Sequence, residues 1–191
     1  MTKIKLLKLS GLTLCFTLLL ALGGCSKQRP PSINNDLLLA VGLDNTSEVI
    51  RLLDKGADVN SQEDDTPLYV AANLGRKDIA ELLISRGAKI DGKGDAKSGN
   101  RTPLHAAALR GSRDVAALLL SQGADINAKD VAGATPLHFA AREGRKDVAE
   151  LLIAKGADIN AMDKDGRTPL AYSRDKKRFL VTEILKQHNA K

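Results

Sequence analysis

Tryptophan is absent from this chain of 191 residues, and aromatic residues together make up only 3% of it. Cysteine is also scarce, since the chain has two Cys residues. So few Cys exclude a fold that is held together by several disulfides. Hydrophobic residues at 43% and charged residues at 27% exclude a disordered chain and a membrane protein with many spans. The composition fits one compact folded unit.

The net charge of +6 is concentrated at the two ends of the chain. Residues 1–24 carry three Lys and no acidic residue, and residues 174–191 carry six basic against two acidic residues. Residues 25–173 hold 20 basic and 21 acidic side chains and are close to neutral. Nucleic acid is therefore not expected as a partner, because binding it needs a basic body that follows the phosphates. The aromatic residues after residue 25 are expected at helical core positions, not on a base-stacking platform; they are Tyr69, Phe139, Tyr172 and Phe179.

The first 25 residues have the organisation of an export signal. A basic N-terminal segment precedes an apolar stretch from Leu9 to Leu22, and Gly-Gly-Cys follows. The apolar stretch is too short for a bilayer core, which needs roughly 20 residues in a helix. We expect residues 1–24 to be a cleaved signal peptide.

Residues 22–25, Leu-Gly-Gly-Cys, resemble the lipobox of bacterial lipoproteins. The resemblance implies that Cys25 is acylated and that residues 25–34 form a polar tether to the membrane. In bacteria with two membranes, Ser26 after this Cys implies the periplasmic side of the outer membrane. An ordinary signal peptide that leaves Cys25 as a free thiol is the alternative.

Two short sequence motifs, called words below, recur beyond residue 34. Thr-Pro-Leu begins at residues 66, 102, 135 and 168, and Gly-Ala followed by a charged residue begins at residues 56, 87, 123 and 156. Words repeated at this spacing resemble the ankyrin repeat, whose period is about 33 residues. The resemblance implies an all-α ankyrin-repeat solenoid over residues 35–191, with about five stacked helix-turn-helix units and finger loops between them. We number these units 1 to 5; they span residues 35–65, 66–101, 102–134, 135–167 and 168–191.

Unit 4 illustrates the signals for two helices in each repeat. Thr135 and Pro136 predict a helix start, because Thr accepts a bond from a first-turn amide and Pro needs no such bond. Gly144 breaks this helix, and the apolar residues between Val148 and Ile153 predict a second helix by their spacing. Gly156 predicts the end of the second helix. Such a unit is stable only when neighbouring units stack against it.

The end units depart from this pattern. In unit 1, Asn35-Asp36 replaces Thr-Pro, and Asp44 stands where the central units have Gly. In unit 5, Lys177 takes the Gly position within a basic run at 174–178. We expect that run to be a solvated cap, with a site for an acidic partner as the alternative.

The finger loop at residues 91–101 is three residues longer than the later ones. Both a tolerated surface insertion and an additional partner contact are consistent with it. Its sequence contains three Gly and several charged residues, which predicts a surface position.

No residues in the repeats have the pattern of a catalytic or metal site. Catalysis needs a nucleophile, or an acid and a base, brought together in a pocket, and zinc needs about four converging ligands. We therefore expect no enzyme activity, no catalytic residue, no cofactor and no metal. The ankyrin resemblance gives His105 and His138 a structural role, bonding backbone groups between repeats.

In ankyrin-repeat proteins, partners are usually held by the finger tips and by the exposed ends of the first helices. Apolar residues at such positions would contact the partner, with charged neighbours as a polar rim; scattered surface apolar residues are the alternative. The unbound protein is expected to be a monomer, with membrane contact only through the lipid on Cys25. The matching positions in this chain are Asp64, Asp65, Asn73, Leu74, Asn100, Arg101, Leu109, Arg110, Lys129, Val131, Ala132, Ala134, Arg142, Glu143, Met162, Lys164, Asp165 and Arg167, with Asp175 and Lys176 in the last unit.

The sequence therefore predicts a lipid-anchored protein that binds another protein in the periplasm. The first hypothesis is an immunity protein that neutralises an antibacterial toxin, such as a secreted phospholipase effector of a type VI secretion system. The alternative is a cell-envelope scaffold or an oxidative-stress protection factor that binds an endogenous periplasmic protein.

Overall fold

A computed structural model describes residues 32–62, 65–95, 98–188 and 190. The predicted signal peptide, Cys25 and most of the predicted tether lie outside these residues. The regular secondary structure of the described residues is α-helical. None of these helices is long and apolar enough to cross a membrane. They are α2 (Ile33–Gly42), α3 (Thr46–Asp54), α4 (Pro67–Leu74), α5 (Lys77–Ser85), α6 (Pro103–Arg110), α7 (Arg113–Ser121), α8 (Pro136–Glu143), α9 (Lys146–Ala154), α10 (Pro169–Asp175) and α11 (Phe179–Gln187).

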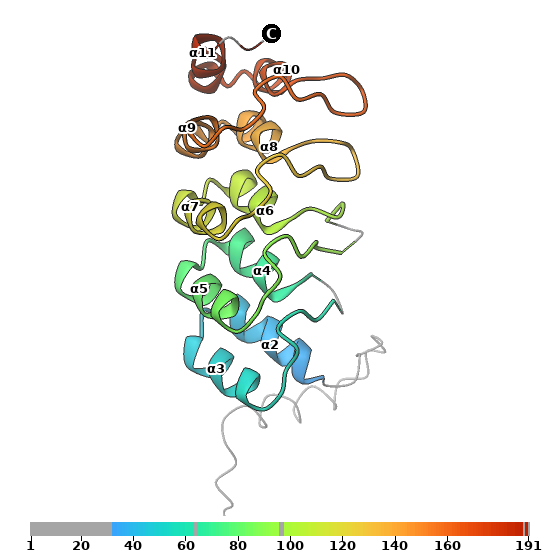
Figure 1. The fold of residues 1–191 in the computed structure, drawn as a ribbon, viewed down its shortest axis with the longest axis vertical. Helices are drawn as coiled ribbons and strands as arrows, with labels where there is room; N and C mark the ends of the chain where they lie inside the picture. The colour runs from blue at the N-terminus through green and yellow to red at the C-terminus, as the bar shows by residue number, and fades with distance from the viewer. Residues whose placement is uncertain (1–31, 63–64, 96–97, 189, 191) are drawn as a thin grey trace, which may run out of the picture. The chain divides into compact units, whose positions relative to one another are not determined.

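The helices form two layers of a regular stack (Figure 1). The first layer consists of α2, α4, α6, α8 and α10, and the second layer contains the helix that follows each of them. The finger loops project beside the first layer (Figure 1). This arrangement confirms the predicted all-α ankyrin-repeat stack of about five helix pairs.

The first-layer helices α4, α6, α8 and α10 start where the Thr-Pro word predicts. Thr66 Oγ1 accepts a hydrogen bond from the Tyr69 amide at 3.3 Å, and Thr168 Oγ1 accepts one from the Ala171 amide at 3.4 Å. Pro occupies the first turn of α4, α6, α8 and α10, where its missing amide hydrogen leaves no bond unmade.

The first unit begins differently from the prediction. Ser32 caps α2 by accepting a bond from the Asn34 amide at 3.2 Å, so the helix starts at Ile33, two residues before the expected start of unit 1. Asn35 and Asp36, expected to replace Thr-Pro, lie inside α2. A Ser at this position is a good N-cap, and no Pro follows it to fix the start later.

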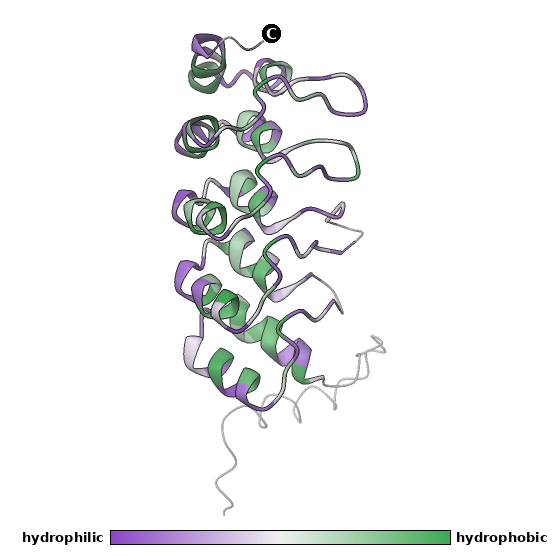
Figure 2. Ribbon diagram, viewed as in Figure 1, coloured by the Kyte–Doolittle hydropathy of each residue, from purple (hydrophilic) through white to green (hydrophobic). Residues whose placement is uncertain are grey.

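The core lies between the two layers and between successive units. The Leu of each Thr-Pro-Leu word is buried, as is one Leu in each later second-layer helix, such as Leu119, Leu152 and Leu185. Paired Ala residues are also buried in the middle of α4, α6 and α8 and allow close approach of the helices. In Figure 2 the first-layer helices are predominantly apolar, whereas the second-layer helices alternate between apolar and polar residues.

One aromatic residue contradicts its predicted core position. Tyr69 and Phe139 are buried and Tyr172 is half-buried, but Phe179 is 75% exposed. Phe179 is the first residue of α11, which is the position that Lys77 holds in α5. A side chain at this point of the second helix faces solvent, so an apolar residue there adds nothing to the core.

Arginine side chains join the helix turns of successive units. Arg145 Nε donates to the Leu109 carbonyl at 3.1 Å, and Arg178 Nε donates to the Arg142 carbonyl at 3.0 Å. Gly111 lies beneath Arg145, and a Cβ at Gly111 would come within 2.8 Å of the Arg145 Cδ atom. Glycine at this turn therefore permits both the left-handed backbone conformation and the close approach of the next unit.

Candidate protein-binding surface

In units 3 and 4 a buried histidine of the first helix holds the finger loop of the same unit. His105 Nε2 lies 3.0 Å from the Ala134 carbonyl, and His138 Nε2 lies 3.0 Å from the Arg167 carbonyl. In each ring Nδ1 accepts the backbone amide hydrogen of the Thr three residues earlier, at 3.2 and 3.1 Å. This acceptor role assigns the ring hydrogen to Nε2, which donates to the finger. The predicted structural role of both histidines is confirmed, but their bonds run within one unit, from its first helix to its own finger, and not between repeats.

Burial keeps both imidazoles neutral. It lowers the pKa of His105 to about 4, and it also lowers the pKa of His138. A protonated ring would have no acceptor for the Thr amide, so the neutral form and the hydrogen-bond pattern agree. Each histidine fixes where the following finger leaves the stack.

Two buried carboxylates shape the finger tips. Asp130 Oδ1 accepts the amide hydrogens of Ala132 and Ala134 at 2.8 and 2.9 Å. Asp163 Oδ1 does the same for Asp165 and Arg167 at 2.9 and 2.8 Å. Sequence reasoning missed this role, although in both fingers an Asp is followed three residues later by Gly, a spacing typical of a turn.

The Asp163 carboxylate is also an ion-pair centre. The Arg167 guanidinium lies 3.0 Å from it, and the Tyr172 hydroxyl donates to it at 2.8 Å. Burial by itself would raise the pKa of Asp163, but hydrogen bonds from Arg167 and Tyr172 outweigh burial and lower the pKa to about 2. Burial and the bond to Asp163 raise the pKa of Tyr172 to about 12. The finger of unit 4 is therefore tied to α10 of unit 5.

Neighbouring fingers are hydrogen-bonded to one another. The Val131 amide donates to the Gly99 carbonyl at 3.1 Å, and the Lys164 amide donates to the Ala132 carbonyl at 2.9 Å. The longer finger at residues 91–101 is thus connected to the next finger through Gly99. Three successive fingers form one continuous ridge whose backbone is held before any partner binds.

Most of the predicted partner-binding residues are accessible on this ridge or beside it. Val131 is 52% exposed and Met162 is 58% exposed, which is high for large apolar side chains. Leu74 is also exposed, at the C-terminal end of α4. Other exposed residues are Asn100, Arg110, Lys129, Ala132, Lys164, Asp165, Arg167, Asp175 and Lys176, and the half-buried ones are Asp65, Asn73, Arg101, Arg142 and Glu143.

Three predicted residues need a different description. Ala134 is only 2% exposed and its carbonyl is held by His105, so it belongs to the connection between α6 and the finger of unit 3 and is wrong as a displayed residue. Leu109 packs partly against the core, so the stack does gain from it. Asp64 lies outside the described residues.

Basic side chains cover the aromatic ring of unit 4. The guanidinium carbon of Arg101 lies 4.6 Å from the Phe139 ring centre, and that of Arg142 lies 5.0 Å from it. Arg101 also pairs with the buried Asp130 at 3.6 Å. Arg101 is therefore partly structural, whereas Arg142 pairs only with its half-exposed neighbour Glu143 within the described part of the chain.

A shallow depression follows at the junction of units 4 and 5. It has a volume of about 240 Å³ and brings together predicted residues from three elements. Its lining consists of Arg142, Arg167, Tyr172, Asp175 and Lys176. The described residues contain no group of three or more His, Cys, Asp or Glu placed to hold a metal ion. The ridge and the depression beside it therefore present charged and apolar side chains in a fixed arrangement.

Part of the chain is similar to a mouse protein, the 2-5A-dependent ribonuclease of Mus musculus. The two are 45% identical over 58 residues, which is 29% of this chain and 8% of the mouse protein. The chain therefore spans less than a tenth of this curated relative, whose name describes the activity of that protein as a whole.

Family profiles of known repeats match most of the chain. The profile for ankyrin repeats in three copies matches residues 13–94 and 37–130, and the profile for a single ankyrin repeat matches residues 132–164. These matches coincide with the helix pairs and fingers of Figure 1 from α2 to the finger of unit 4. This chain belongs to the ankyrin-repeat family.

Proposed function

We propose that this protein holds a protein partner on the ridge formed by its fingers. Ankyrin repeats typically bind protein partners. The observation that carries the proposal is the fixed ridge itself. Its backbone bonds are made within the chain, while Lys129, Val131, Met162 and Lys164 keep their side chains exposed. A preorganised surface of this kind loses little conformational entropy on binding.

The exposed residues of adjacent fingers alternate in character. Lys129 in unit 3 stands at the position of Met162 in unit 4, and Val131 stands at the position of Lys164. Lys129 Nζ reaches the Met162 carbonyl at 3.3 Å. Apolar contacts surrounded by cations are a usual composition for a protein interface.

A binding role also accounts for the titratable groups better than catalysis does. His105, His138, Asp130 and Asp163 are buried and bonded to backbone groups of the fingers. Each is engaged in fixing the ridge. Our proposal therefore includes no enzyme activity and no cofactor.

The proposed location rests on the sequence. The lipobox-like residues 22–25 favour acylation of Cys25, and Ser26 favours the periplasmic side of the outer membrane. Labelling cells with an alkyne fatty acid tests this, because Cys25→Ser should abolish the label. A labelled Cys25→Ser variant would refute the anchor while leaving the binding proposal intact.

The proposed partner is an antibacterial toxin such as a secreted phospholipase effector, with this protein as its immunity protein. A lipid-anchored binding surface in the periplasm would meet such a toxin before it reaches the membrane. A strain without the gene should lose fitness beside toxin-producing siblings. Unchanged fitness there, together with sensitivity to peroxide, would instead favour the alternative of an envelope protection factor.

The binding role is tested by capture of partners on the full chain, followed by titration of the partner identified by mass spectrometry. Val131→Asp with Met162→Asp should weaken the complex at least about tenfold, because two exposed apolar contacts are replaced by charges. Lys146→Ala on α9 is the matched control, since this exposed residue lies in the second layer away from the fingers. Equal affinity of both variants would contradict binding on the ridge.

A further inference from the structure

The segment that joins α10 to α11 differs from the corresponding segments of the inner units; we call residues 174–180 the α10–α11 turn, which includes the last two residues of α10, the turn at 176–178 and the first two residues of α11. Lys177 stands where those turns have Gly, and it adopts the same left-handed backbone with a φ of 53°. Phe179-Leu180 then opens the second helix. The inner units carry a basic and an acidic residue at these two positions, namely Lys77-Asp78, Arg113-Asp114 and Lys146-Asp147.

These substitutions are unfavourable for folding and solubility. An acidic residue in the first turn of a helix interacts favourably with the free amides there, and Leu180 gives up that interaction. A side chain on a left-handed residue is strained, and Lys177 accepts that strain. Residues that disfavour the local backbone conformation or the helix start, and that add nothing to the packing, are expected at functional positions.

The apolar pair is displayed to solvent. Phe179 is 75% exposed and Leu180 is 70% exposed, which makes them the two most exposed large hydrophobic residues in the described part of the chain. Together with Glu143, Gly144, Arg178 and Val181 they line a hollow of about 200 Å³. An exposed apolar pair beside a hollow is a suitable seat for a large side chain of a partner.

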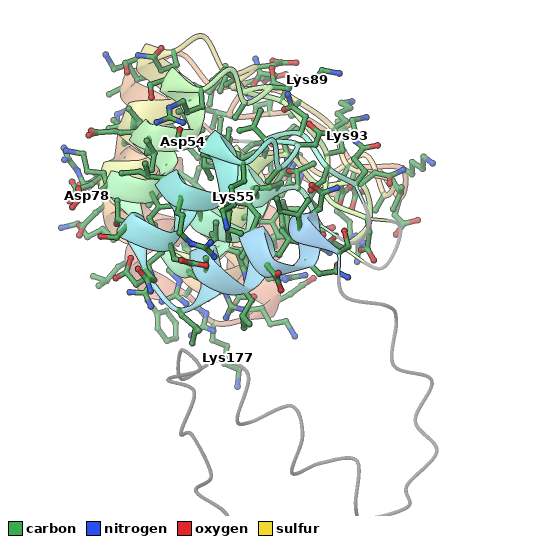
Figure 3. All side chains as sticks on the ribbon, turned by 90° about the horizontal axis from the view of Figure 1, so that it is seen from below. Asp54, Lys55, Asp78, Lys89, Lys93 and Lys177 are labelled. Atoms are coloured by element: carbon green, nitrogen blue, oxygen red, sulfur yellow. The ribbon has the colours of Figure 1, made fainter. Side chains whose placement is uncertain are left out.

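Positive charge predominates on the α10–α11 side of the apolar pair, while Glu143 lines the other side of the hollow. Four cations lie in the turn against one acidic residue, and all of them are exposed. None of the four forms an ion pair within the residues that the structure describes. In Figure 3, which is viewed from one end of the stack, Lys177 projects away from the body of the repeats. The cations are Arg174, Lys176, Lys177 and Arg178, and the acidic residue is Asp175.

The charges decide among the possible occupants of this patch. In a two-fold dimer, each copy would bring its own four cations against the same four of its partner, which is repulsive. An acidic protein segment has the complementary charge.

We propose that the α10–α11 turn docks a segment of a partner protein in which acidic residues flank a large apolar side chain. The apolar side chain would occupy the hollow against Phe179 and Leu180, and the carboxylates would pair with the surrounding cations. This inference rests on the proposed protein-binding function and specifies the chemistry of the partner.

The test uses random 12-residue peptides displayed on phage and selected against the full chain. Selected peptides should be enriched in Asp and Glu next to Phe, Leu or Trp. In a fluorescence anisotropy titration, Phe179→Lys with Leu180→Asp should weaken such a peptide at least about tenfold, and Arg174→Glu with Lys176→Glu should do the same. The first variant restores the pair of the inner units, so its circular dichroism and denaturation midpoint should be at least as good as those of the parent.

The matched control is Lys146→Ala with Asp147→Ala, which changes the same two positions in α9 and should leave peptide affinity unchanged. Peptides that bind the Phe179→Lys, Leu180→Asp variant as well as the parent would overturn the assignment of this patch but leave protein binding through the ridge untouched. A failure to select any peptide would also overturn it. So would a dimer in sedimentation, or binding to phosphatidylglycerol vesicles, that the same variant abolishes.

Discussion

The inner units 3 and 4 and the terminal unit 5 solve the same packing problem with different residues. Units 3 and 4 each have a His that holds the finger of the same unit, a Gly at the left-handed turn and a basic-acidic pair at the start of the second helix. Unit 5 has Ala171, Lys177 and Phe179-Leu180 at the same positions.

The difference follows from the number of neighbours. An inner unit must fit a unit on either side, and contacts across the boundary set its Gly and Arg positions, as Gly111 of unit 3 and Arg145 of unit 4 show. Among the described residues, unit 5 packs against unit 4, since α10 contacts α8 and α11 contacts α9. Residues released from stacking can serve another purpose, which is where the exposed apolar pair occurs.

The largest contrast is expected for one Leu at the same position of α9 and α11. Leu152→Ala should lower the free energy of unfolding by about 2 to 5 kcal/mol, because Leu152 is fully buried in a helix that contacts both neighbouring units, so the cavity would collapse little. Leu185→Ala should cost less, since the end unit can relax or fray locally. Guanidinium denaturation followed by circular dichroism measures both, and equal losses would show that unit 5 is packed as rigidly as unit 4.

Acid should lower the free energy of unfolding by protonating the buried histidines that hold the fingers of units 3 and 4. The pKa of His105 is about 4 in the fold and about 6.5 in the unfolded chain, so the unfolded chain binds more protons between these values. Above pH 6.5 the ring is neutral in both states, and His105 costs the fold nothing. As the pH falls toward 4, the free energy of unfolding decreases, and the decrease due to His105 reaches about 3 kcal/mol. His138 contributes in the same direction.

The measurement is the free energy of unfolding in urea at several pH values for the parent chain and for His105→Gln. The variant should show a flatter dependence between pH 6.5 and 4. Ala171 at the equivalent position of unit 5 predicts that no such dependence arises there. An unchanged slope in His105→Gln would mean that this ring does not supply the acid sensitivity.

The turn residues should respond in opposite directions. Gly144→Ala should destabilise the protein by about 1 to 2 kcal/mol, because its φ is 71° and an added Cβ would come within 2.9 Å of the Arg178 Cδ atom. Lys177→Gly should stabilise it by about 1 kcal/mol by relieving the left-handed strain. Melting midpoints check both signs; a destabilised Lys177→Gly variant would show that the Lys side chain supports the turn.

The smallest effect on stability is expected for Arg142→Ala. Its side chain is half-exposed and pairs with Glu143, while the backbone carbonyl that Arg178 needs is kept. The free energy of unfolding should therefore change by less than about 1 kcal/mol. Affinity for the partner should still fall about tenfold, as measured by titration, if Arg142 is a displayed contact. A loss of stability as large as that of Leu152→Ala would contradict the division into stacking and displayed residues.

Elements with local signals could be predicted from the sequence. Thr-Pro at residues 66, 102, 135 and 168 begins a helix wherever it occurs, because capping and the Pro ring act within one turn. The role of His105 could be inferred from its place in the repeated word. Signals of this kind need no knowledge of the neighbouring unit.

Exposure within the fingers was less predictable. Ala134 lies two residues after the exposed Ala132, but its carbonyl is held by a His that lies 29 residues earlier. Phe179 fits a helical apolar pattern as well as Val181 does, and only the position of unit 4 decides that one is exposed and the other buried. Local sequence does not contain that information.

The sequence by itself determined the repeat, the helix pairs and the turns of this protein, because each of these depends on interactions within a few residues of one unit. The tertiary structure alone decided which side chains of the fingers and of the last turn remain displayed. The physical reason is that burial in a solenoid is a property of the contact between units, and a position is buried only where the next unit covers it.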